Sequence, residues 1–395
     1  MSPSRTWSAL ALLGCILCSK VARADLTFPR PIFTQDRKFQ ILAPARVIKV
    51  AAQIPFPVFA FEDSLSQCPL NMAQVSTQLE RSFTKGSRLE QALSLLDPQF
   101  LDALSHLKVT IVLDDFGGRN EIFRSFYLPN QPEKGDGIIA LDCSQQTQEQ
   151  WESILAHEIV HVLSQDRGLE SWFEEGLAQL IEVQSGGNKP WRSAASVKKL
   201  NLIPNVFETQ RPLPSTESYG LAFLFVKYLE SNWGGWPLLS ALYHSDYSPV
   251  EPKEGKFLEL LTSFARKFLD QAQYDSHLTA KMTPKGIFQN FVMALMLHRL
   301  GHPFYSLPDW PGFSSEPASN LPPYPLEKGQ WIRIKPDLNL EKMINSGLEG
   351  YRVQANLKDF DIQKWSDPSK FLKETVINEM VFIQSEGFVN YSEPY

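Results

Sequence analysis

The stretch SILAHEIVHVLSQD, residues 153–166, carries the pattern H-E-x-x-H at positions 157–161, within apolar residues at helical spacing. Residues four apart lie on one face of a helix, so His157 and His161 can bind the same metal ion. Glu158 is turned by about 100° from His157, where it can hold a metal-bound water. The stretch therefore predicts a helix with two metal ligands and a general base, and a zinc hydrolase is the leading hypothesis.

Two histidines do not complete a catalytic zinc site, which needs about three protein ligands and one open position for water. A metzincin would supply a Gly three residues after His161 and a His six residues after it. Those positions hold Ser164 and Arg167, so the metzincin arrangement is excluded. A Glu on the next predicted helix is then the expected third ligand.

Two glutamates in the stretch SWFEEGLAQLI, residues 171–181, can provide that ligand. Ser171 and Glu174 have the spacing of a capping box, which predicts a structural role for Glu174 at the start of this helix. Glu175 is therefore favoured as the third ligand, and Glu174 is the alternative. Gly176 is expected to let the two helices approach closely.

The order of these two motifs resembles that of a known peptidase family. H-E-x-x-H at 157–161, followed by W-F-E-E-G-L-A at 172–178, is similar to the gluzincin zinc metallopeptidases, in the peptidase-MA-like superfamily that includes the M1 aminopeptidases. The resemblance covers roughly residues 105–240. It implies an α+β fold: a thermolysin-like zincin domain with a small mixed sheet, the motif helix and a following helical subdomain, here with N- and C-terminal extensions.

The family's site residues can be carried over position by position. The resemblance implies that His157, His161 and Glu175 bind zinc (Zn2+) and that Glu158 is the general base. It also implies that the substrate is a peptide or protein, hydrolysed through a zinc-bound water. In this family the strand before the motif helix, here residues 137–141, typically forms a sheet edge that pairs with extended substrate.

A further match is residues 218–222, Ser-Tyr-Gly-Leu-Ala, at the start of an amphipathic pattern. Related enzymes often have a Tyr at a similar point that donates a hydrogen bond to the oxyanion, which makes Tyr219 a second catalytic candidate. The alternative is a half-buried aromatic residue at a helix start. The chain departs from the family at Gln179, four residues after Glu175, where thermolysin-type enzymes carry an acid that supports a ligand His. A Gly-x-Met-Glu-Asn exopeptidase segment is also missing from the sequence, so aminopeptidase specificity is not expected.

The first residues of the chain have the pattern of a secretory signal peptide. Arg5 precedes an apolar run at 7–18, and small residues follow at Ala22 and Ala24. The run is too short to span a membrane, and no later run qualifies. We therefore expect residues 1–24 to be removed and the protein to be exported, either periplasmic or extracellular. An outer-membrane lipoprotein with a lipid anchor at Cys15 is the alternative.

Charge and cysteine content are compatible with export. Removal of residues 1–24 takes away three basic residues and no acids, so the net charge changes from −6 to −9. An acidic protein gains nothing electrostatically from nucleic acid, which is not an expected partner. Cys68 and Cys143 remain, and an oxidising compartment allows them to form a disulfide. Two separate buried thiols are the equally weighted alternative.

The chain divides by composition into three parts after the signal peptide. We expect an N-terminal extension at 25–104, the metallopeptidase domain at 105–300 and a region rich in Pro and aromatic residues at 301–395. His298 and His302 also lie four apart, but they lack the Glu and are interpreted as surface or cap residues. Two other functions stay open: a non-catalytic, zinc-stabilised binding or assembly protein of the envelope, and a zinc amidase that acts on a non-peptide substrate.

Overall fold

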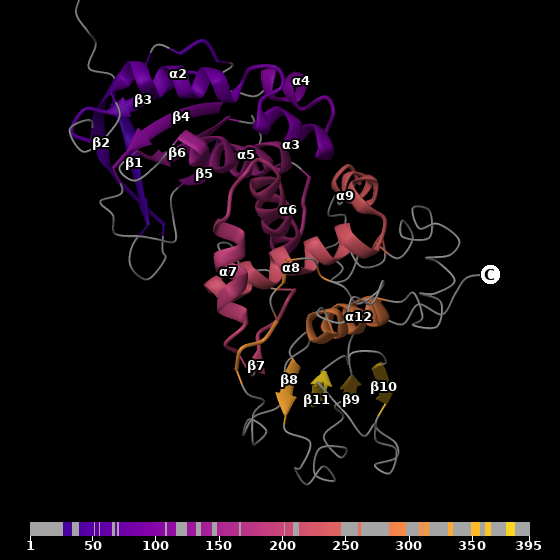
Figure 1. Cartoon of the computed structure of the whole chain (residues 1–395). Coiled ribbons are helices and arrows are strands. Elements are labelled where there is room, and N and C mark those ends of the chain that lie inside the picture. The colour runs from indigo at the N-terminus through magenta and orange to yellow at the C-terminus, as the bar shows by residue number, and fades with distance from the viewer. Residues whose placement is uncertain are drawn as a thin grey trace, which may run out of the picture.

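A computed structural model of the chain has a mixed α+β architecture, as the sequence predicts (Figure 1). The structure describes residues 27–33, 39–50, 52–54, 56–64, 68, 71–106, 109–115, 125–131, 136–143, 148–165, 167–200, 202–207, 213–245, 260–261, 284–297, 307, 309–310, 312–315, 331–334, 349–355, 360–364 and 377–383. The expected signal peptide at 1–24, with Cys15, and the residues His298 and His302 lie outside these ranges.

The N-terminal half is built on a six-stranded sheet of order β1-β2-β3-β4-β6-β5. The strands are β1 (Thr27–Phe33), β2 (Phe39–Val50), β3 (Val58–Phe61), β4 (Val109–Asp114), β5 (Ser125–Gln131) and β6 (Asp136–Asp142). β3, β4 and β6 run parallel to one another, and the other neighbours are antiparallel. The expected boundary at residue 104 therefore falls within one sheet, because three of its strands precede that residue.

The position of β6 corrects one expectation. Residues 137–141 were expected to form the sheet edge, but β5 pairs with the outer side of β6, with Ser125 opposite Leu141. The prediction is wrong because β5 comes only four residues before β6 in the sequence. The chain reverses between the two strands, so β6 runs antiparallel beside β5. The strand at this edge of the sheet is therefore β5, and β1 lies at the opposite edge. The register of β5 against β6 shifts between Pro129 and Gln131.

Helices cover one face of this sheet and pack against every second residue of its strands. Ile111, Leu113, Ile139 and Leu141 are buried in one core with apolar residues of the helices. Those helices are α2 (Met72–Ser82), α3 (Arg88–Leu96), α4 (Phe100–Ser105) and α5 (Gln148–Ser164). The motif helix α5 is thereby held against the sheet, and it also contacts the edge strand β5.

The helices that follow α5 form a second layer. They are α6 (Ser171–Gln184), α7 (Lys189–Val197), α8 (Thr216–Asn232), α9 (Gly235–Tyr243) and α12 (Pro284–Leu297). α6 packs between α5 and α8, and α7 packs on α8. Trp172 and Phe173 are fully buried in this layer, and the Trp172 ring lies 5.4 Å from that of Phe225 on α8.

Glycine permits the close packing of α6, although against a different helix than expected. A Cβ atom at Gly176 would lie 2.5 Å from Val226 Cγ2 and 2.6 Å from the Ala222 carbonyl oxygen, both on α8. The close approach that Gly176 allows is thus to α8 rather than to the motif helix α5. It brings the start of α8, which carries Tyr219, beside the helix that carries Glu175.

A second sheet lies in the C-terminal part, of order β10-β9-β11-β8-β7. Its strands are β7 (Leu202–Ile203), β8 (Trp331–Ile334), β9 (Glu349–Ala355), β10 (Phe360–Lys364) and β11 (Ile377–Ile383). Residues 202–203 belong to the segment expected to form the metallopeptidase domain, and they pair with β8. The C-terminal region is therefore joined to the helical layer through a shared sheet.

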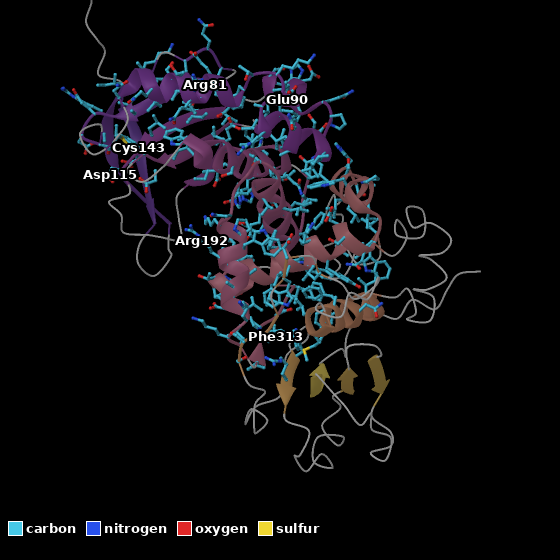
Figure 2. All side chains as sticks on the ribbon, viewed as in Figure 1. Arg81, Glu90, Asp115, Cys143, Arg192 and Phe313 are labelled. Atoms are coloured by element: carbon cyan, nitrogen blue, oxygen red, sulfur yellow. A yellow bond between two sulfur atoms is a disulfide. The ribbon has the colours of Figure 1, made fainter. Side chains whose placement is uncertain are left out.

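Two further observations concern the cysteine pair and the search for membrane-spanning helices. Cys68 and Cys143 form a disulfide, with their Cα atoms 5.1 Å apart, so the first of the two alternatives holds. Cys143 directly follows β6, in the part of the molecule that contains the six-stranded sheet (Figure 2). No helix within the described ranges is long and apolar enough to cross a membrane.

Candidate metal centre

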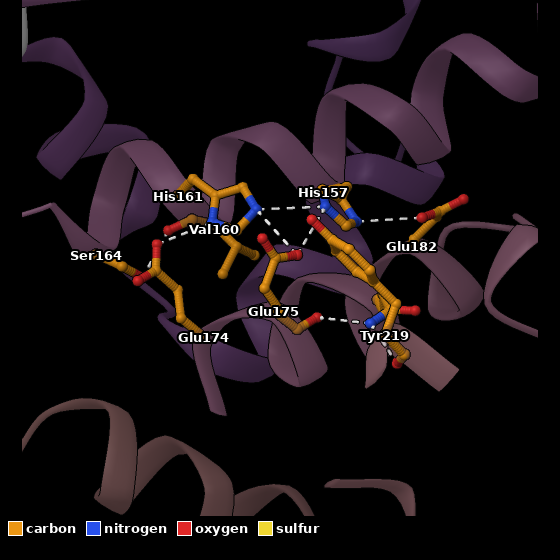
Figure 3. Close-up of polar contacts among 9 residues, drawn as sticks. His157, Val160, His161, Ser164, Glu174, Glu175, Glu182 and Tyr219 are labelled. Carbon is orange, nitrogen blue, oxygen red and sulfur yellow. Dashed lines mark hydrogen bonds and ion pairs between the residues drawn. The ribbon is translucent and has the colours of Figure 1, made fainter. Parts of the chain in front are cut away.

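Three predicted ligands meet where α5 and α6 pack together. His157 and His161 lie one turn apart on α5, and Glu175 faces them from α6 (Figure 3). The Nε2 atoms of the two histidines are 3.3 Å apart. Glu175 Oε2 lies 3.7 Å from each of them. These atoms can all contact one ion.

The spacing of these atoms fits a tetrahedral metal. Bonds of about 2.0–2.1 Å to a tetrahedral zinc place its ligand atoms roughly 3.3–3.4 Å from one another. Glu175 Oε2 is buried and accepts no hydrogen bond from the described part of the chain. A buried carboxylate oxygen without a donor is costly unless a cation lies beside it. The residues present therefore fit a bound divalent metal.

The site is partly open to solvent. The side chains of His157, His161 and Glu175 are 12%, 13% and 18% exposed. A purely structural metal site is closed by four protein ligands, whereas a catalytic site keeps one position accessible. Three protein ligands at a partly exposed position match the second arrangement.

Each histidine has a carboxylate on its other ring nitrogen. His157 Nδ1 lies 3.1 Å from Glu182 Oε2, and His161 Nδ1 lies 2.8 Å from Glu174 Oε1. The side chains of both glutamates are only 4% exposed. Hydrogen bonds of this kind orient an imidazole and determine which nitrogen faces a metal.

Glu174 therefore has a different role from the one expected. The capping box with Ser171 is wrong, because α6 begins at Ser171 itself and Glu170 is the residue in the N-cap position. Ser171 is thus inside the first turn, where it does not have the extended backbone of a cap. Glu174 instead points to His161, where its carboxylate forms a charge-assisted hydrogen bond with the imidazole.

The carboxylates around His161 change its protonation in the metal-free protein. Burial by itself lowers the pKa of His161, but the negative charges of Glu175, Glu174 and Glu158 and the hydrogen bond to Glu174 outweigh it. The result is a pKa raised from 6.5 to about 9. His161 is therefore expected to be protonated at neutral pH when no metal is bound.

The two catalytic candidates lie beside this cluster. Glu158 is 3% exposed, and its charge acts on His161. Tyr219 is half-buried at the start of α8, and its side chain points toward the three ligands in Figure 3. The structure thus brings both candidates to the ligand cluster.

Gln179, which occupies the position where thermolysin-type enzymes carry an acid, forms a hydrogen bond between two helices. Gln179 Nε2 donates hydrogen bonds to the carbonyl oxygens of Tyr219, at 3.0 Å, and Glu175, at 3.3 Å. It therefore links α8 to α6 and does not support a ligand histidine.

The acid that supports His157 is Glu182, which the sequence interpretation missed. A signal was available, since Glu182 comes seven residues after Glu175 and residues seven apart lie on the same helix face.

The other described histidines lie away from this cluster. His106 Nε2 is 3.7 Å from Asp102 at an exposed position, and His244 Nε2 is 3.9 Å from Asp97. Comparison of the chain with protein-family models and with curated proteins found no match.

Proposed function

We propose that the protein is an exported zinc-dependent metallopeptidase of the gluzincin type. The observation that carries this proposal is the convergence of His157, His161 and Glu175, with Glu158 on the same helix as the two histidines. This arrangement favours a hydrolase, because three protein ligands leave the fourth position of the metal for a water molecule and Glu158 can act as its general base.

Zinc is the metal that this set of donors favours. Two imidazole nitrogens and one carboxylate oxygen are a common ligand set of catalytic zinc, whereas calcium and magnesium prefer oxygen donors alone. The disulfide between Cys68 and Cys143 supports export, because such bonds persist in oxidising compartments. The signal-peptide pattern in the sequence of residues 1–24 supports the same localisation.

In the proposed mechanism, His157, His161 and Glu175 would hold a zinc ion, which would supply Lewis acidity to the attacking water and the scissile carbonyl. Glu158 accepts the proton of the attacking water and then donates it to the leaving amine. The hydroxyl of Tyr219 donates a hydrogen bond to the oxygen that becomes negatively charged. Glu158 is 3% exposed, and it lies on the same helix as the two histidines.

The edge strand β5 is the proposed binding site for the peptide backbone. It is the outer strand of the sheet and contacts α5, which carries His157 and His161. An extended peptide can add to such an edge through main-chain hydrogen bonds, with its side chains contributing specificity. This assignment replaces residues 137–141 with residues 125–131 as the peptide-binding strand.

The test is the isosteric variant Glu158→Gln, which should retain zinc and lose at least a hundredfold in peptide turnover, because it removes the base and keeps the shape. Glu152→Gln on the same helix is the matched control and should retain activity. Proteomic cleavage profiling with the purified protein, with and without a chelator, identifies the peptide bonds that it cleaves. Chelator-insensitive cleavage, or equal cleavage by Glu158→Gln, would end the assignment. Zinc retention without any cleavage favours the non-catalytic binding protein.

A further inference from the structure

Both metal-facing histidines are supported by carboxylates that come from the same helix as the third ligand. Glu174, Glu175 and Glu182 all lie on α6, and the two histidines lie on α5. Glu174 and Glu182 are 3% exposed as whole residues, as buried as the surrounding core. Buried carboxylates are rare unless they are paired, and here the two imidazoles are their partners.

We propose that Glu174 and Glu182 are positioning residues of the metal centre, which hold both imidazoles with their Nε2 atoms toward the metal. The inference rests on the proposed function only in requiring that the site binds metal. It assigns to Glu182 the support that the family resemblance placed four residues after Glu175, at Gln179. It also assigns a support to His161, from the residue that directly precedes the ligand Glu175.

The chemistry of the two hydrogen bonds determines which nitrogen binds. An ionised carboxylate can only accept a hydrogen bond, so Nδ1 of His157 and of His161 must donate. A neutral imidazole that donates from Nδ1 has its lone pair on Nε2. In the neutral form that binds metal, both imidazoles direct the Nε2 lone pair to the space that Glu175 Oε2 also faces, at 3.7 Å from each nitrogen. The ligands are thereby oriented before the metal arrives.

The backbone around Glu182 holds its side chain in this position. A Cβ atom at Gly187 would lie 2.7 Å from Glu182 Cγ and 2.9 Å from Ser153 Cβ, so the glycine leaves room for the carboxylate between α5 and the turn after α6. The Glu182 carbonyl accepts hydrogen bonds from Gly187 N, at 2.8 Å, and from Ser185 Oγ, at 3.0 Å. Its backbone and its side chain are thus both constrained.

The two carboxylates contribute a hydrogen bond and a negative charge, and these can be separated by substitution. A Gln at 174 or 182 keeps an acceptor of the same shape and removes the charge, whereas an Ala removes both. Supporting groups of this kind typically contribute ten- to a hundredfold to metal affinity. We therefore expect about a tenfold loss of zinc affinity for each Gln variant and about a hundredfold loss for each Ala variant.

The experiment measures zinc affinity by competition with a chromophoric chelator, and the visible absorption of Co2+ bound in place of zinc. The variants are E174Q, E182Q, E174A and E182A, each checked for folding by circular dichroism. Glu230→Gln on α8 is the matched control, because Glu230 accepts from Lys227 Nζ at 2.7 Å in an unrelated ion pair. The control should bind zinc like the wild type. The altered Co2+ spectrum expected for the Ala variants reports ligand geometry, which a purely structural role would not change.

The outcomes separate this inference from the proposed function. Wild-type zinc affinity and an unchanged Co2+ spectrum in folded E174Q and E182Q would overturn the positioning role and leave the peptidase proposal in place. Weaker binding in these variants, with no cleavage by the wild type, would support the positioning role and overturn the peptidase. If the Ala variants do not fold, the Gln variants decide. A wild-type protein that binds no zinc would overturn both.

Discussion

The side-chain amide of Gln179 donates a hydrogen bond to the carbonyl oxygen of Tyr219 at 3.0 Å, from a position that is 4% exposed. Through this bond the helix that carries Glu175 holds the start of the helix that carries the proposed oxyanion donor. The two groups are forty residues apart in sequence.

Replacing Gln179 by Met removes both donors and keeps a similar side-chain length. We expect kcat to fall about tenfold or more, because small displacements of a catalytic group are costly. The free energy of unfolding should fall by about 1–3 kcal/mol, because two hydrogen bonds are lost and each contributes about 0.5–1.5 kcal/mol. Zinc affinity should stay near the wild-type value. Gln91→Met is the control, because Gln91 also donates to a backbone carbonyl, that of Gly86, but at an exposed position. An unchanged kcat in Gln179→Met would contradict the link.

Gly187→Ala tests the placement of Glu182 without removing any donor or acceptor. The new Cβ atom would lie 2.7 Å from Glu182 Cγ and 2.9 Å from its carbonyl oxygen, so the glutamate must shift. We expect about a tenfold weaker zinc affinity, similar to a supporting group that is lost. Gly86→Ala provides the comparison: its φ of +83° makes Ala strained, but no atom lies within 4 Å of the new Cβ. It should cost roughly 1 kcal/mol of stability and no zinc affinity. Equal zinc affinity in both variants would refute the prediction.

The raised pKa of His161 predicts how the stability of the metal-free protein varies with pH. Its pKa is about 9 in the folded protein, against 6.5 for an ordinary histidine. The folded state then binds the proton more tightly, so this stabilisation is complete below about pH 6.5 and is lost as the pH rises to about 9. Urea unfolding in the presence of a chelator should show this loss. His161→Gln should show a flatter dependence over the same range, and parallel curves for the two proteins would count against the assignment.

The disulfide between Cys68 and Cys143 predicts a dependence of stability on redox state. It closes a loop with a sequence separation of 75, which restricts the unfolded chain by an amount equivalent to about 4 kcal/mol. A Cys68→Ala/Cys143→Ala double variant should therefore unfold at a lower urea concentration than the oxidised wild type. Reductant should lower the midpoint of the wild type and leave that of the double variant unchanged. A wild-type midpoint that does not respond to reductant would contradict the contribution of the bond.

Much of the metal centre follows from local periodicity. His157 and His161 share a helix face, and the helix forms where the apolar spacing predicts it. Glu175 follows from the second helix, whose apolar residues are buried as expected. These features depend on residues close in sequence, so they can be read from the pattern alone.

The remaining features depend on contacts between distant residues. Glu182 is one of several acids at helical spacing, and only the packing of α6 on α5 shows that it reaches His157. The same packing gives Glu174 a partner in place of the expected cap. Strand order has a similar origin, since β5 and β6 both have strand patterns and only their pairing decides which one lies at the edge.

The position of β5 at the end of the strand order has a consequence for how the protein should behave at high concentration. An edge that can receive a peptide can also receive the same strand of a second copy, which leads to self-association. β5 contains Pro129, which has no backbone donor, and its register is irregular between Pro129 and Gln131. A long, continuous ladder between copies is therefore interrupted, while a short extended segment can still pair with the regular part of the strand.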